Sequence, residues 1–468
     1  MASSLAERMR VFEARDPGPG EDTSQVKATT RLETVEVTAD GEGLVSRAGV
    51  ALLVELADRV GLTGALSEAL ASSRERRSAH DPGRVIRDVA VMLADGGDCV
   101  TDLDAYRGQE RLFGAKASET TTHRVLKSVD EGLLSQIREA RAAARARVWE
   151  AGARPDTLTL DIDATILIAH SEKEQTAGTW KRTFGYHPLE CYLDETGEPL
   201  AALLRPGNAG SNTAEDHSRV LELALAQLPA DDLDRPMLVR TDIGGCTHAF
   251  IDDVRAANIR FSVGYEVDER VREAVLKLKE CAWIQGIEPD GEERDGAWVA
   301  ELTEHLDLSA WGEGSRLICR RERPHPGAQF TIFDEHGYRY TCFLTDQNDA
   351  DIAGLELRHR GRARVEDRIR CGKDTGMRNL PHHAFAHNQT WLEISLIAQE
   401  LLCWTRLLCL DGQLALAEPK KLRHRLLHVA GRIVRSGRRT RLRLQSDWPW
   451  AKALVTAFTK LRSIPALC

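Results

Sequence analysis

The chain has 468 residues and a formal net charge of −9 at pH 7, a length that suggests two to four domains of ordinary size. It has no apolar run long enough to span a membrane and no signal peptide at its amino terminus, so we expect a cytoplasmic protein with no membrane partner. The ten cysteines include no C-x2-C pair, which argues against a zinc ribbon and against a disulfide framework.

The amino-terminal third of the chain predicts a tail followed by helices. Residues 1–42 are rich in Glu, Asp, Thr, Gly and Pro, and we expect them to be disordered. Apolar residues then recur at helical spacing in 50–71, 82–93 and 120–151. Residues 43–153 are therefore predicted to form a helical domain.

The pattern changes at Pro155 to alternating strands and helices. Residues 157–168 form a β-branched run typical of a buried central strand, and residues 184–204 are typical of a hairpin. A helix is expected in 213–228 and a short buried strand in 237–241, and a further helix and strand in 250–264. This order predicts an α/β core in residues 154–265.

Residues 266–342 interrupt that core with short alternating segments and three tryptophans, and we expect a β-rich insertion subdomain. The α/β pattern resumes in 343–410, which ends in a long apolar helix. Tryptophans in a small β subdomain are expected in its core, although an exposed one could stack on a base flipped out of DNA. Trp298 is the candidate for that contact.

The last segment, 411–468, carries 13 Lys or Arg residues against 3 Asp or Glu, although the whole chain is acidic. Two basic strands are expected near 426–434 and 440–444. Such a cluster is the electrostatic footprint of a nucleic-acid partner, and a solvated basic face without a ligand is the alternative. The candidate DNA contacts are Arg423, Arg425, Arg432, Arg435, Arg438 and Arg439.

Four carboxylates occupy positions where a polar group is hard to explain. Asp161 and Asp163 interrupt a predicted buried strand, Asp242 ends another, and Glu366 lies in a basic helix. A buried carboxylate costs several kcal/mol unless it is paired or metal-bound. Each acid alone could be a cap or an ion pair, but together they suggest a divalent-metal site for phosphoryl transfer, because Mg²⁺ prefers carboxylate and phosphate oxygens.

The basic helix contains the pattern H-x2-R-x3-E-x6-K at His359, Arg362, Glu366 and Lys373. On an ideal helix these positions fall within about 60° of one another. One face would then present a carboxylate flanked by three potential cations, which suits a metal ion and a phosphodiester. The alternative is an ordinary surface ion pair between Arg362 and Glu366.

Three motifs carry a resemblance to a known family. They are D-I-D-A-T around Asp163, R-T-D-I-G-G around Asp242, and R-x3-E-x6-K from Arg362. From about Gly43 to its end, the sequence resembles DDE transposases of bacterial insertion sequences, in the group with a Tyr-x2-Arg-x3-Glu-x6-Lys catalytic helix and most closely the IS thirteen-eighty branch. His359 departs from this pattern, because it stands where the family has Tyr.

The resemblance implies a ribonuclease-H-like catalytic core with a β insertion and a helical amino-terminal domain for DNA binding or oligomerisation. Asp163, Asp242 and Glu366 would hold two Mg²⁺ or Mn²⁺ ions, with Asp161 as a neighbour or an alternative ligand. His359, Arg362 and Lys373 would contact DNA phosphates. The implied partners are the terminal inverted repeats and target DNA, bound by a homodimer in a paired-end complex at the nucleoid.

Two other functions compete with this interpretation. The run D-I-D-A-T also fits the D-x-D-x-T motif of haloacid-dehalogenase-like phosphatases, in which Asp161 would be the nucleophile and Asp163 the general acid. The further metal motif that such a phosphatase needs is not found downstream. A catalytically silent DNA-binding relative is the second alternative, and the joint presence of the three acids with Arg362 and Lys373 argues against it.

Overall fold

The computed structural model describes residues 35–74, 79–324 and 337–465. The chain divides into two compact units, Met1–Glu42 and Gly43–Cys468. Most of the first unit, where disorder was expected, lies outside the described residues, and its described part, 35–42, contains no helix or strand. All elements below belong to the second unit.

The second unit begins with helices, as the apolar periodicity predicts. They are α1 (Val50–Arg59), α2 (Leu62–Ala69), α3 (Pro82–Ala94), α4 (Glu110–Phe113), α5 (Glu119–Lys127) and α6 (Glu131–Val148). The expected helical stretch 120–151 is divided, because Asp130 accepts a hydrogen bond from the backbone NH of Leu133 and starts α6 as a new helix. Two helices therefore replace one long one.

A nine-stranded mixed sheet forms the centre of the unit and confirms the expected α/β class. Its strand order is β10-β11-β12-β13-β9-β8-β2-β6-β7. The five strands at one end are β2 (Leu158–Ala164), β6 (Leu189–Leu193), β7 (Pro199–Leu203), β8 (Met237–Thr241) and β9 (Arg260–Tyr265). β2, β8 and β9 run parallel to one another, whereas β6 and β7 are antiparallel to their neighbours.

The two faces of β2 have different chemistry. Leu158, Leu160 and Ile162 pack into the main hydrophobic core, to which α7 (Ala214–Leu225) and α8 (His248–Ala256) also contribute. Asp161 and Asp163 alternate to the other face. There Tyr192, which lies opposite Asp161 on β6, packs against α11 (Arg364–Gly372). The polar face of β2 therefore lies beside the helix that carries Glu366.

The inserted segment extends the central sheet. It contains α9 (Glu269–Lys277), β10 (Ile284–Ile287), β11 (Glu293–Glu301) and β12 (Arg316–Glu322). β13 (Arg339–Thr345) pairs with β9 and β12 at its two edges, so the hydrogen bonds continue from the core into the insertion. Pairing with β13 satisfies the backbone groups that β9 would otherwise leave open at an edge.

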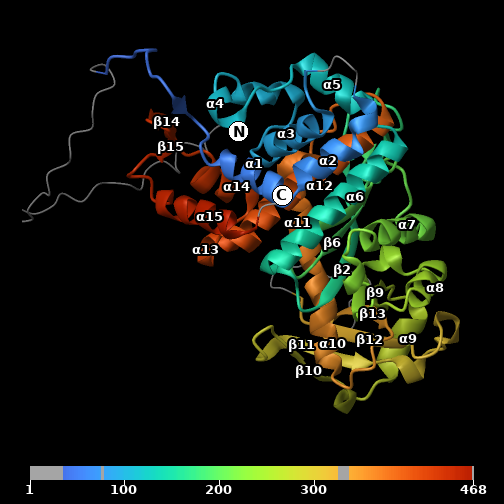
Figure 1. Cartoon of the computed structure of the whole chain (residues 1–468). Helices are drawn as coiled ribbons and strands as arrows, with labels where there is room; N and C mark the ends of the chain where they lie inside the picture. Colours follow the sequence, from blue (N-terminus) through green and yellow to red (C-terminus); the bar gives the residue numbers. More distant parts are fainter. Residues whose placement is uncertain (1–34, 75–78, 325–336, 466–468) are drawn as a thin grey trace, which may run out of the picture. The chain divides into compact units, whose positions relative to one another are not determined.

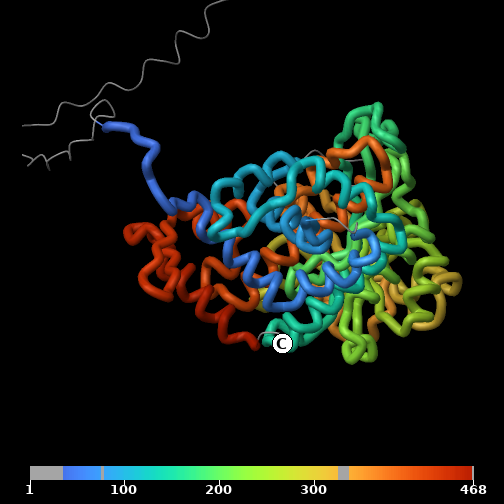
Figure 2. Tube along the Cα trace, turned by 45° about the horizontal axis from the view of Figure 1, so that its top comes forward, coloured from blue at the N-terminus to red at the C-terminus, as the bar shows by residue number. Residues whose placement is uncertain are grey.

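The carboxy-terminal segment returns to the helices at the start of the unit. Its elements are α10 (Ile352–Arg360), α11, α12 (Phe385–Cys409), α13 (Gly412–Ala415), α14 (Pro419–Leu422), β14 (Gly431–Ser436), β15 (Arg439–Leu444) and α15 (Ala451–Ser463). α15 contacts α1 and α12, and β14 pairs with β1 (Leu44–Val45), so segments distant in sequence lie side by side (Figures 1 and 2). None of the described helices has the length and apolarity needed to cross a membrane.

The first basic strand begins later than expected. Residues 423–427 form a helical turn that buries Leu426 and Leu427, and the strand starts at Gly431. Leu422 and Leu426 are four residues apart, so both apolar side chains reach the core from one side of a helix. The second basic strand, β15, includes the expected 440–444.

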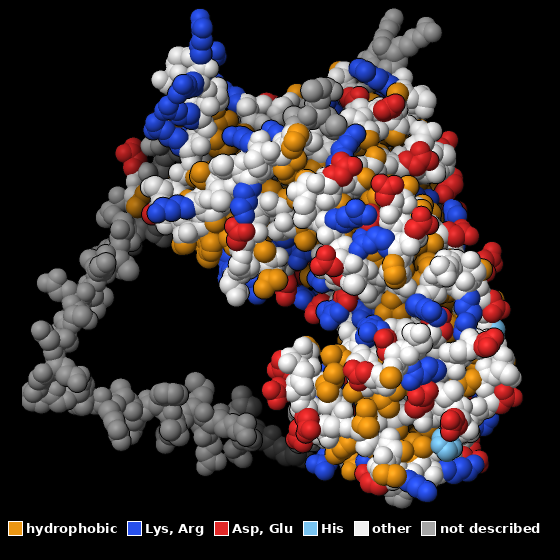
Figure 3. Space-filling view, turned by 60° about the horizontal axis from the view of Figure 1, so that its bottom comes forward, with side chains coloured by type: hydrophobic (Ala, Val, Ile, Leu, Met, Phe, Trp, Pro, Cys, Tyr) orange, Lys and Arg blue, Asp and Glu red, His pale blue; other side chains and the backbone are white. Residues whose placement is uncertain are grey.

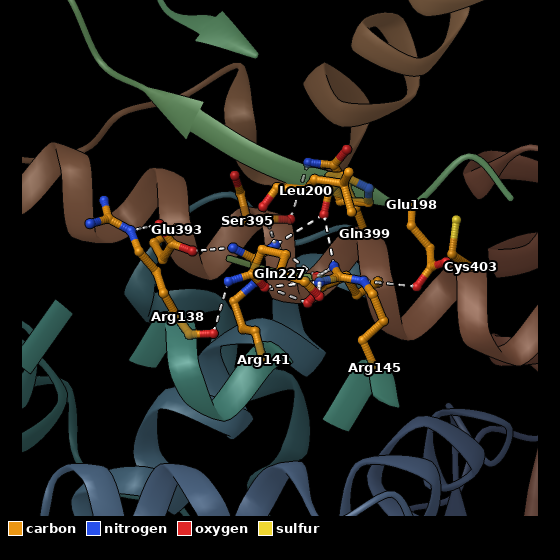
Figure 4. A network of polar contacts seen from close by, with 12 residues as sticks. Arg138, Arg141, Arg145, Glu198, Leu200, Gln227, Glu393, Ser395, Gln399 and Cys403 are labelled. Atoms are coloured by element: carbon orange, nitrogen blue, oxygen red, sulfur yellow. Dashed lines mark hydrogen bonds and ion pairs between the residues drawn. The ribbon is translucent and has the colours of Figure 1, made fainter. Parts of the chain in front are cut away.

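A buried Arg–Glu network joins α6 to α12 and the sheet (Figure 4). It consists of Arg141, Arg145, Glu198, Glu393 and Glu400, each at most 1% exposed. Arg141 Nη2 lies 2.7 Å from Glu400 Oε1, and Arg145 Nε lies 3.1 Å from Glu198 Oε1. Arg141 also pairs with Glu393, and Arg145 with Glu400. Each carboxylate in the network thus accepts a bond from a guanidinium, which offsets the cost of its burial.

Candidate active site

Two of the predicted acids meet at one edge of the sheet. β2 and β8 are parallel neighbours, and Ile162 is in register with Thr241. Asp163 and Asp242, the next residue of each chain segment, therefore lie side by side at the carboxyl ends of these strands. Glu366 lies in the first turn of α11, which contacts β2. Carboxyl ends of parallel strands are where open α/β sheets bind ligands.

The three acids are electrostatically coupled. Burial first, and then the charges of Asp242 and Glu366, raise the pKa of Asp163 to about 6. Arg362 opposes this shift of the pKa, because its Nη1 lies 3.4 Å from Asp163 Oδ2. Arg362 Nη2 also lies 3.9 Å from Glu366 Oε1. The Arg362 guanidinium therefore lies between two carboxylates that repel each other, and its single positive charge does not neutralise both of them.

The backbone around Asp242 holds that carboxylate in place. Asp242 Oδ1 accepts a hydrogen bond of 2.8 Å from the Gly244 NH, and the side chain is exposed. β9, the strand next to β8, lies very close to the residue after Asp242. A Cβ added to Gly264 of β9 would lie only 2.9 Å from Ile243 N. Glycine on β9 thus permits this strand to pack closely against the backbone that follows Asp242.

These residues fit a divalent cation. Mg²⁺ and Mn²⁺ prefer oxygen ligands that carry negative charge, and a cation among the acids would counteract the burial and the repulsion that together raise the Asp163 pKa. Among the described residues, Asp98, Cys99 and Asp102 form the one group of three whose ligand atoms all lie within 4.8 Å of one another, so the carboxylates of Asp163, Asp242 and Glu366 are not gathered as closely as that. Asp102 there caps the backbone NH groups of Asp98 and Cys99, which is a structural role.

Asp161 has a structural partner in place of a metal ion. Its Oδ1 and Oδ2 accept bonds of 2.6 and 2.7 Å from Arg240, which also donates to Asp194 at 2.7 Å. The expectation of an alternative metal ligand at Asp161 is therefore corrected. The same pairing is unfavourable for the phosphatase alternative, because both oxygens of the required nucleophile are engaged with a cation.

The helix that was expected to present four residues on one face is broken. α10 ends at Arg360, a 3-10 turn covers Gly361–Ala363, and α11 gives way to a π turn at Lys373. His359 is half-buried: its ring stacks on Phe343 with centroids 4.4 Å apart, and Nδ1 lies 2.9 Å from Ser262 Oγ. Burial first, then the charge of Arg362, lowers the His359 pKa to about 3. His359 is therefore neutral at pH 7, and the face does not carry three cations.

A buried acid that the sequence analysis missed lies next to Asp163. Glu190 is opposite Asp163 in the β2–β6 register, and its Oε2 accepts a 2.8 Å bond from the Tyr192 hydroxyl. Burial raises the pKa of Glu190 to about 8, while the charge of Lys373 opposes the shift. Lys373 itself donates to the Ile166 carbonyl at 3.1 Å. The sequence does show Glu190 as a lone charged residue in an otherwise apolar strand. That it lies opposite Asp163 depends on how β2 and β6 pair, which the sequence does not show.

An open cavity of about 440 Å³ adjoins this group of residues. Asp242, Gly264, His359 and Arg362 contribute to its wall, together with residues of β13. Two acids, Asp242 and Glu266, two guanidinium groups, Arg339 and Arg362, and one neutral imidazole thus line a common space. A phosphodiester could accept hydrogen bonds there from Arg362 and from the imidazole.

The other predicted DNA contacts divide into covered and exposed side chains. Trp298 is half-buried, with the Arg321 and Arg323 guanidinium carbons 5.1 and 5.4 Å from its ring centroid, so the structure does not support base stacking at this position. Arg423 is buried and donates to the Ala94 carbonyl at 2.8 Å, so it is not a DNA contact. Arg425 lies over the Trp450 ring at 5.1 Å.

The exposed arginines lie on the hairpin formed by β14 and β15. They are Arg432, Arg435, Arg438 and Arg439, and Arg441 and Arg443 add to them. Figure 3 shows Lys and Arg side chains gathered on the arm at the upper left, where Figure 1 places this hairpin. The arm is therefore a basic surface that remains available for a polyanion.

A family model and a solved structure are similar to most of the chain. The family model described as transposase DDE domain group 1 matches residues 27–466. A solved piggyBac transposase, in a synaptic complex with hairpin DNA, is similar with 10% sequence identity and a TM-score of 0.39, covering 82% of this chain and 80% of that one. No curated protein matches the sequence.

Proposed function

The chain belongs to the transposase DDE domain group 1 family, a family that implies metal-dependent nuclease and transferase activity, and from this premise we propose that it cleaves the inverted-repeat ends of an insertion sequence. The freed 3′ ends are then joined to target DNA. The observation that carries the proposal is the position of Asp163 and Asp242 at the ends of two parallel strands, electrostatically coupled to Glu366. The five strands around β2 would be the ribonuclease-H-like core.

Asp163, Asp242 and Glu366 would hold the divalent ions, Mg²⁺ or Mn²⁺. When bound, two such ions activate an attacking oxygen and stabilise the leaving oxygen of an in-line displacement at phosphorus. Glu190 keeps its place behind Asp163 through the Tyr192 hydroxyl.

The basic side chains of the site would hold the DNA strand. Arg362 contacts two of the acids and lines the open cavity, so it can turn one N–H edge to a phosphate while keeping the other on Asp163. His359 would donate a neutral hydrogen bond, since Nδ1 is engaged with Ser262 and Nε2 is the remaining ring nitrogen. Lys373 would add charge from the end of α11.

The rest of the molecule offers surfaces for longer DNA. The arginine arm on β14 and β15 would bind inverted-repeat phosphates, and a homodimer would bring two ends together in a paired-end complex on chromosomal DNA. Six exposed arginines on one two-stranded hairpin support the DNA contact. Removing Arg435, Arg438 and Arg439 together should weaken binding to all sequences and make it less dependent on salt.

Glu366→Gln tests the proposal directly. The variant should bind the inverted-repeat duplex as tightly as the parent protein and lose Mg²⁺-dependent nicking, because the amide keeps the shape and removes the charge. Asp367→Asn is the matched control, since Asp367 lies in the same turn, is 74% exposed at its side chain and pairs with Arg370. Equal nicking by the parent protein and Glu366→Gln would contradict the proposed site. No metal-dependent nicking by any of the three proteins would favour the silent DNA-binding alternative.

A further inference from the structure

A small hairpin that follows β2 in the chain presents an unusual tip. β4 (Ala177–Gly178) and β5 (Phe184–Tyr186) are joined by residues 179–183, which we name the hairpin tip. The Thr179 NH donates to the Thr183 carbonyl at 2.7 Å, and the two threonine hydroxyls are 2.8 Å apart. The Arg182 NH donates back to the Thr179 carbonyl at 2.9 Å. These bonds give the tip a defined shape that does not depend on a partner.

The tip carries an exposed tryptophan. All nine tryptophans lie in the described parts of the chain, and eight of them are buried or half-buried. Trp180 is 74% exposed. Single exposed hydrophobic side chains are common on protein surfaces, so Trp180 is a candidate contact because of the charges beside it and not because of its exposure alone.

The charges around Trp180 are positive. Lys181 Nζ lies 5.0 Å from the centre of the Trp180 ring, and both Lys181 and Arg182 are exposed. Within the tip, 179–183, there is no acidic residue. An aromatic ring flanked by two cations has the chemistry of a surface that binds single-stranded nucleic acid, where the ring stacks on a base and the cations contact phosphates.

The tip also lies near the candidate active site. β5 pairs antiparallel with β3 (Leu167–Ile168), the strand that begins four residues beyond Asp163, and Leu167 lies opposite Tyr186. Lys373 donates to the carbonyl of Ile166, three residues beyond Asp163. A strand held at the acids could therefore extend to the tip.

We propose that the hairpin tip captures an unpaired nucleobase of the DNA strand beside the cleavage site: Trp180 stacks on the base, and Lys181 and Arg182 hold the flanking phosphates. The proposal rests on the proposed function, because it assumes a DNA substrate at the acids. It assigns to Trp180 the stacking role for which the sequence alone suggested Trp298. Trp298 is covered by arginine side chains, whereas Trp180 is open to a ligand.

The test compares two probes with the full-length protein in EDTA, so that no cleavage occurs. One probe is a fluorescein-labelled single-stranded oligothymidylate, and the other is a blunt duplex of the same length. Trp180→Ala should weaken binding of the single strand about 10-fold and of the duplex less than about 2-fold, because stacking needs an accessible base face. Trp180→Phe should retain most of the affinity, and Trp180→Leu should behave as Trp180→Ala because it lacks a flat ring.

Three results would overturn the proposal. They are an equal loss on both probes, an affinity of Trp180→Leu equal to that of the parent protein, and a change in sedimentation of Trp180→Ala without DNA. The last result would identify the tip as a contact between copies of the chain. Trp298→Ala should leave the ratio of the two affinities unchanged.

The outcome is separable from the test of the proposed function. Base capture is measured without metal and does not require Glu366, so nicking by Glu366→Gln would reject the catalytic site and leave the binding result standing. Conversely, a loss of nicking in Glu366→Gln with unchanged single-strand affinity in Trp180→Ala would reject base capture alone.

Discussion

The buried Arg–Glu network and the candidate active site use the same kinds of side chain with opposite results. In the network, Glu400 pairs with both Arg141 and Arg145, and Glu198 accepts bonds from Arg145 and two indole NH groups. In the site, burial and then the charges of two other carboxylates raise the pKa of Asp163, and Arg362 at 3.4 Å only partly opposes them. The carboxylate charges are thus almost fully neutralised by arginines in the network, but only partly neutralised in the candidate active site.

This difference separates structural acids from candidate catalytic ones. A carboxylate whose oxygens are all engaged holds the fold together and has no capacity for a further ligand. A carboxylate that is repelled by its neighbours lowers stability and has a high affinity for an added cation. Substitutions should therefore change stability in opposite directions in the two regions.

Asp163→Asn should have the largest effect on activity, because it removes the charge that couples Asp163 to Asp242 and Glu366. We expect metal-dependent nicking to fall by at least about 10³-fold, because an amide is a poor ligand for a hard divalent cation. We also expect the free energy of unfolding to rise by about 1 kcal/mol at pH 7, since a carboxyl pKa raised to about 6 is a cost of the folded state above its unfolded pKa. Nicking assays and chemical denaturation measure the two changes, and a destabilised variant would contradict the interpretation.

Glu400→Gln should have the opposite effect on stability. Removing this charge leaves two buried guanidinium groups short of a partner, which we expect to lower the free energy of unfolding by about 3 kcal/mol. Glu222→Gln is the control, because Glu222 is 67% exposed and its surface pair with Arg219 should contribute less than about 0.5 kcal/mol. If urea denaturation showed similar losses in the free energy of unfolding for both variants, the buried network would contribute no more to stability than a surface ion pair.

Asp161→Asn tests whether an acid two residues from Asp163 belongs to the structural class. It should change the free energy of unfolding by less than about 1 kcal/mol, because the lost charge of the bidentate bond to Arg240 is offset by removal of a carboxyl group whose pKa burial raises to about 6. Nicking should stay within about 10-fold of the parent protein at saturating Mg²⁺. A loss as large as that of Asp163→Asn, measured on the same substrate, would place Asp161 among the metal ligands after all.

His359→Gln should give the smallest effect at pH 7 and should change mainly how stability depends on pH. The folded-state pKa of about 3 lies below the ordinary histidine value, so the unfolded chain binds the proton first as the pH falls. This histidine thus contributes stability above pH 6.5 that is lost between about pH 6.5 and 3, by at most about 1.4 kcal/mol per pH unit. Thermal unfolding of both proteins across that range should give curves that diverge towards neutral pH, and parallel curves would mean that His359 is not held neutral.

Local patterns predicted many elements well. The strand at Met237–Thr241 has the expected bounds, because five consecutive buried residues followed by Asp242 require a short central strand. The hairpin of β6 and β7 and the long apolar helix α12 were also predicted, since each has a periodicity that is read within one segment. The catalytic roles of Asp163, Asp242 and Glu366 remain a prediction that cleavage assays must test.

Other features depend on segments far apart in the chain. Glu190 lies beside Asp163 because of the β2–β6 register, and Arg423 is buried because α3 supplies carbonyl partners to a residue in a basic segment. Neither partner is adjacent in sequence, so charge counting treated Arg423 as a surface cation. Trp180 was overlooked for a similar reason, because exposure is a property of the packed molecule.

The sequence by itself determined the α/β class, the strands that end in Asp163 and Asp242, and the basic carboxy-terminal segment, because periodicity and composition act within a few residues of each position. The tertiary structure decided which charges are compensated. Asp161 and Asp163 are two residues apart in one strand, yet Arg240 engages the first while Asp242 and Glu366 repel the second. Coulomb energy and desolvation depend on distances between segments, and only the folded chain sets those distances.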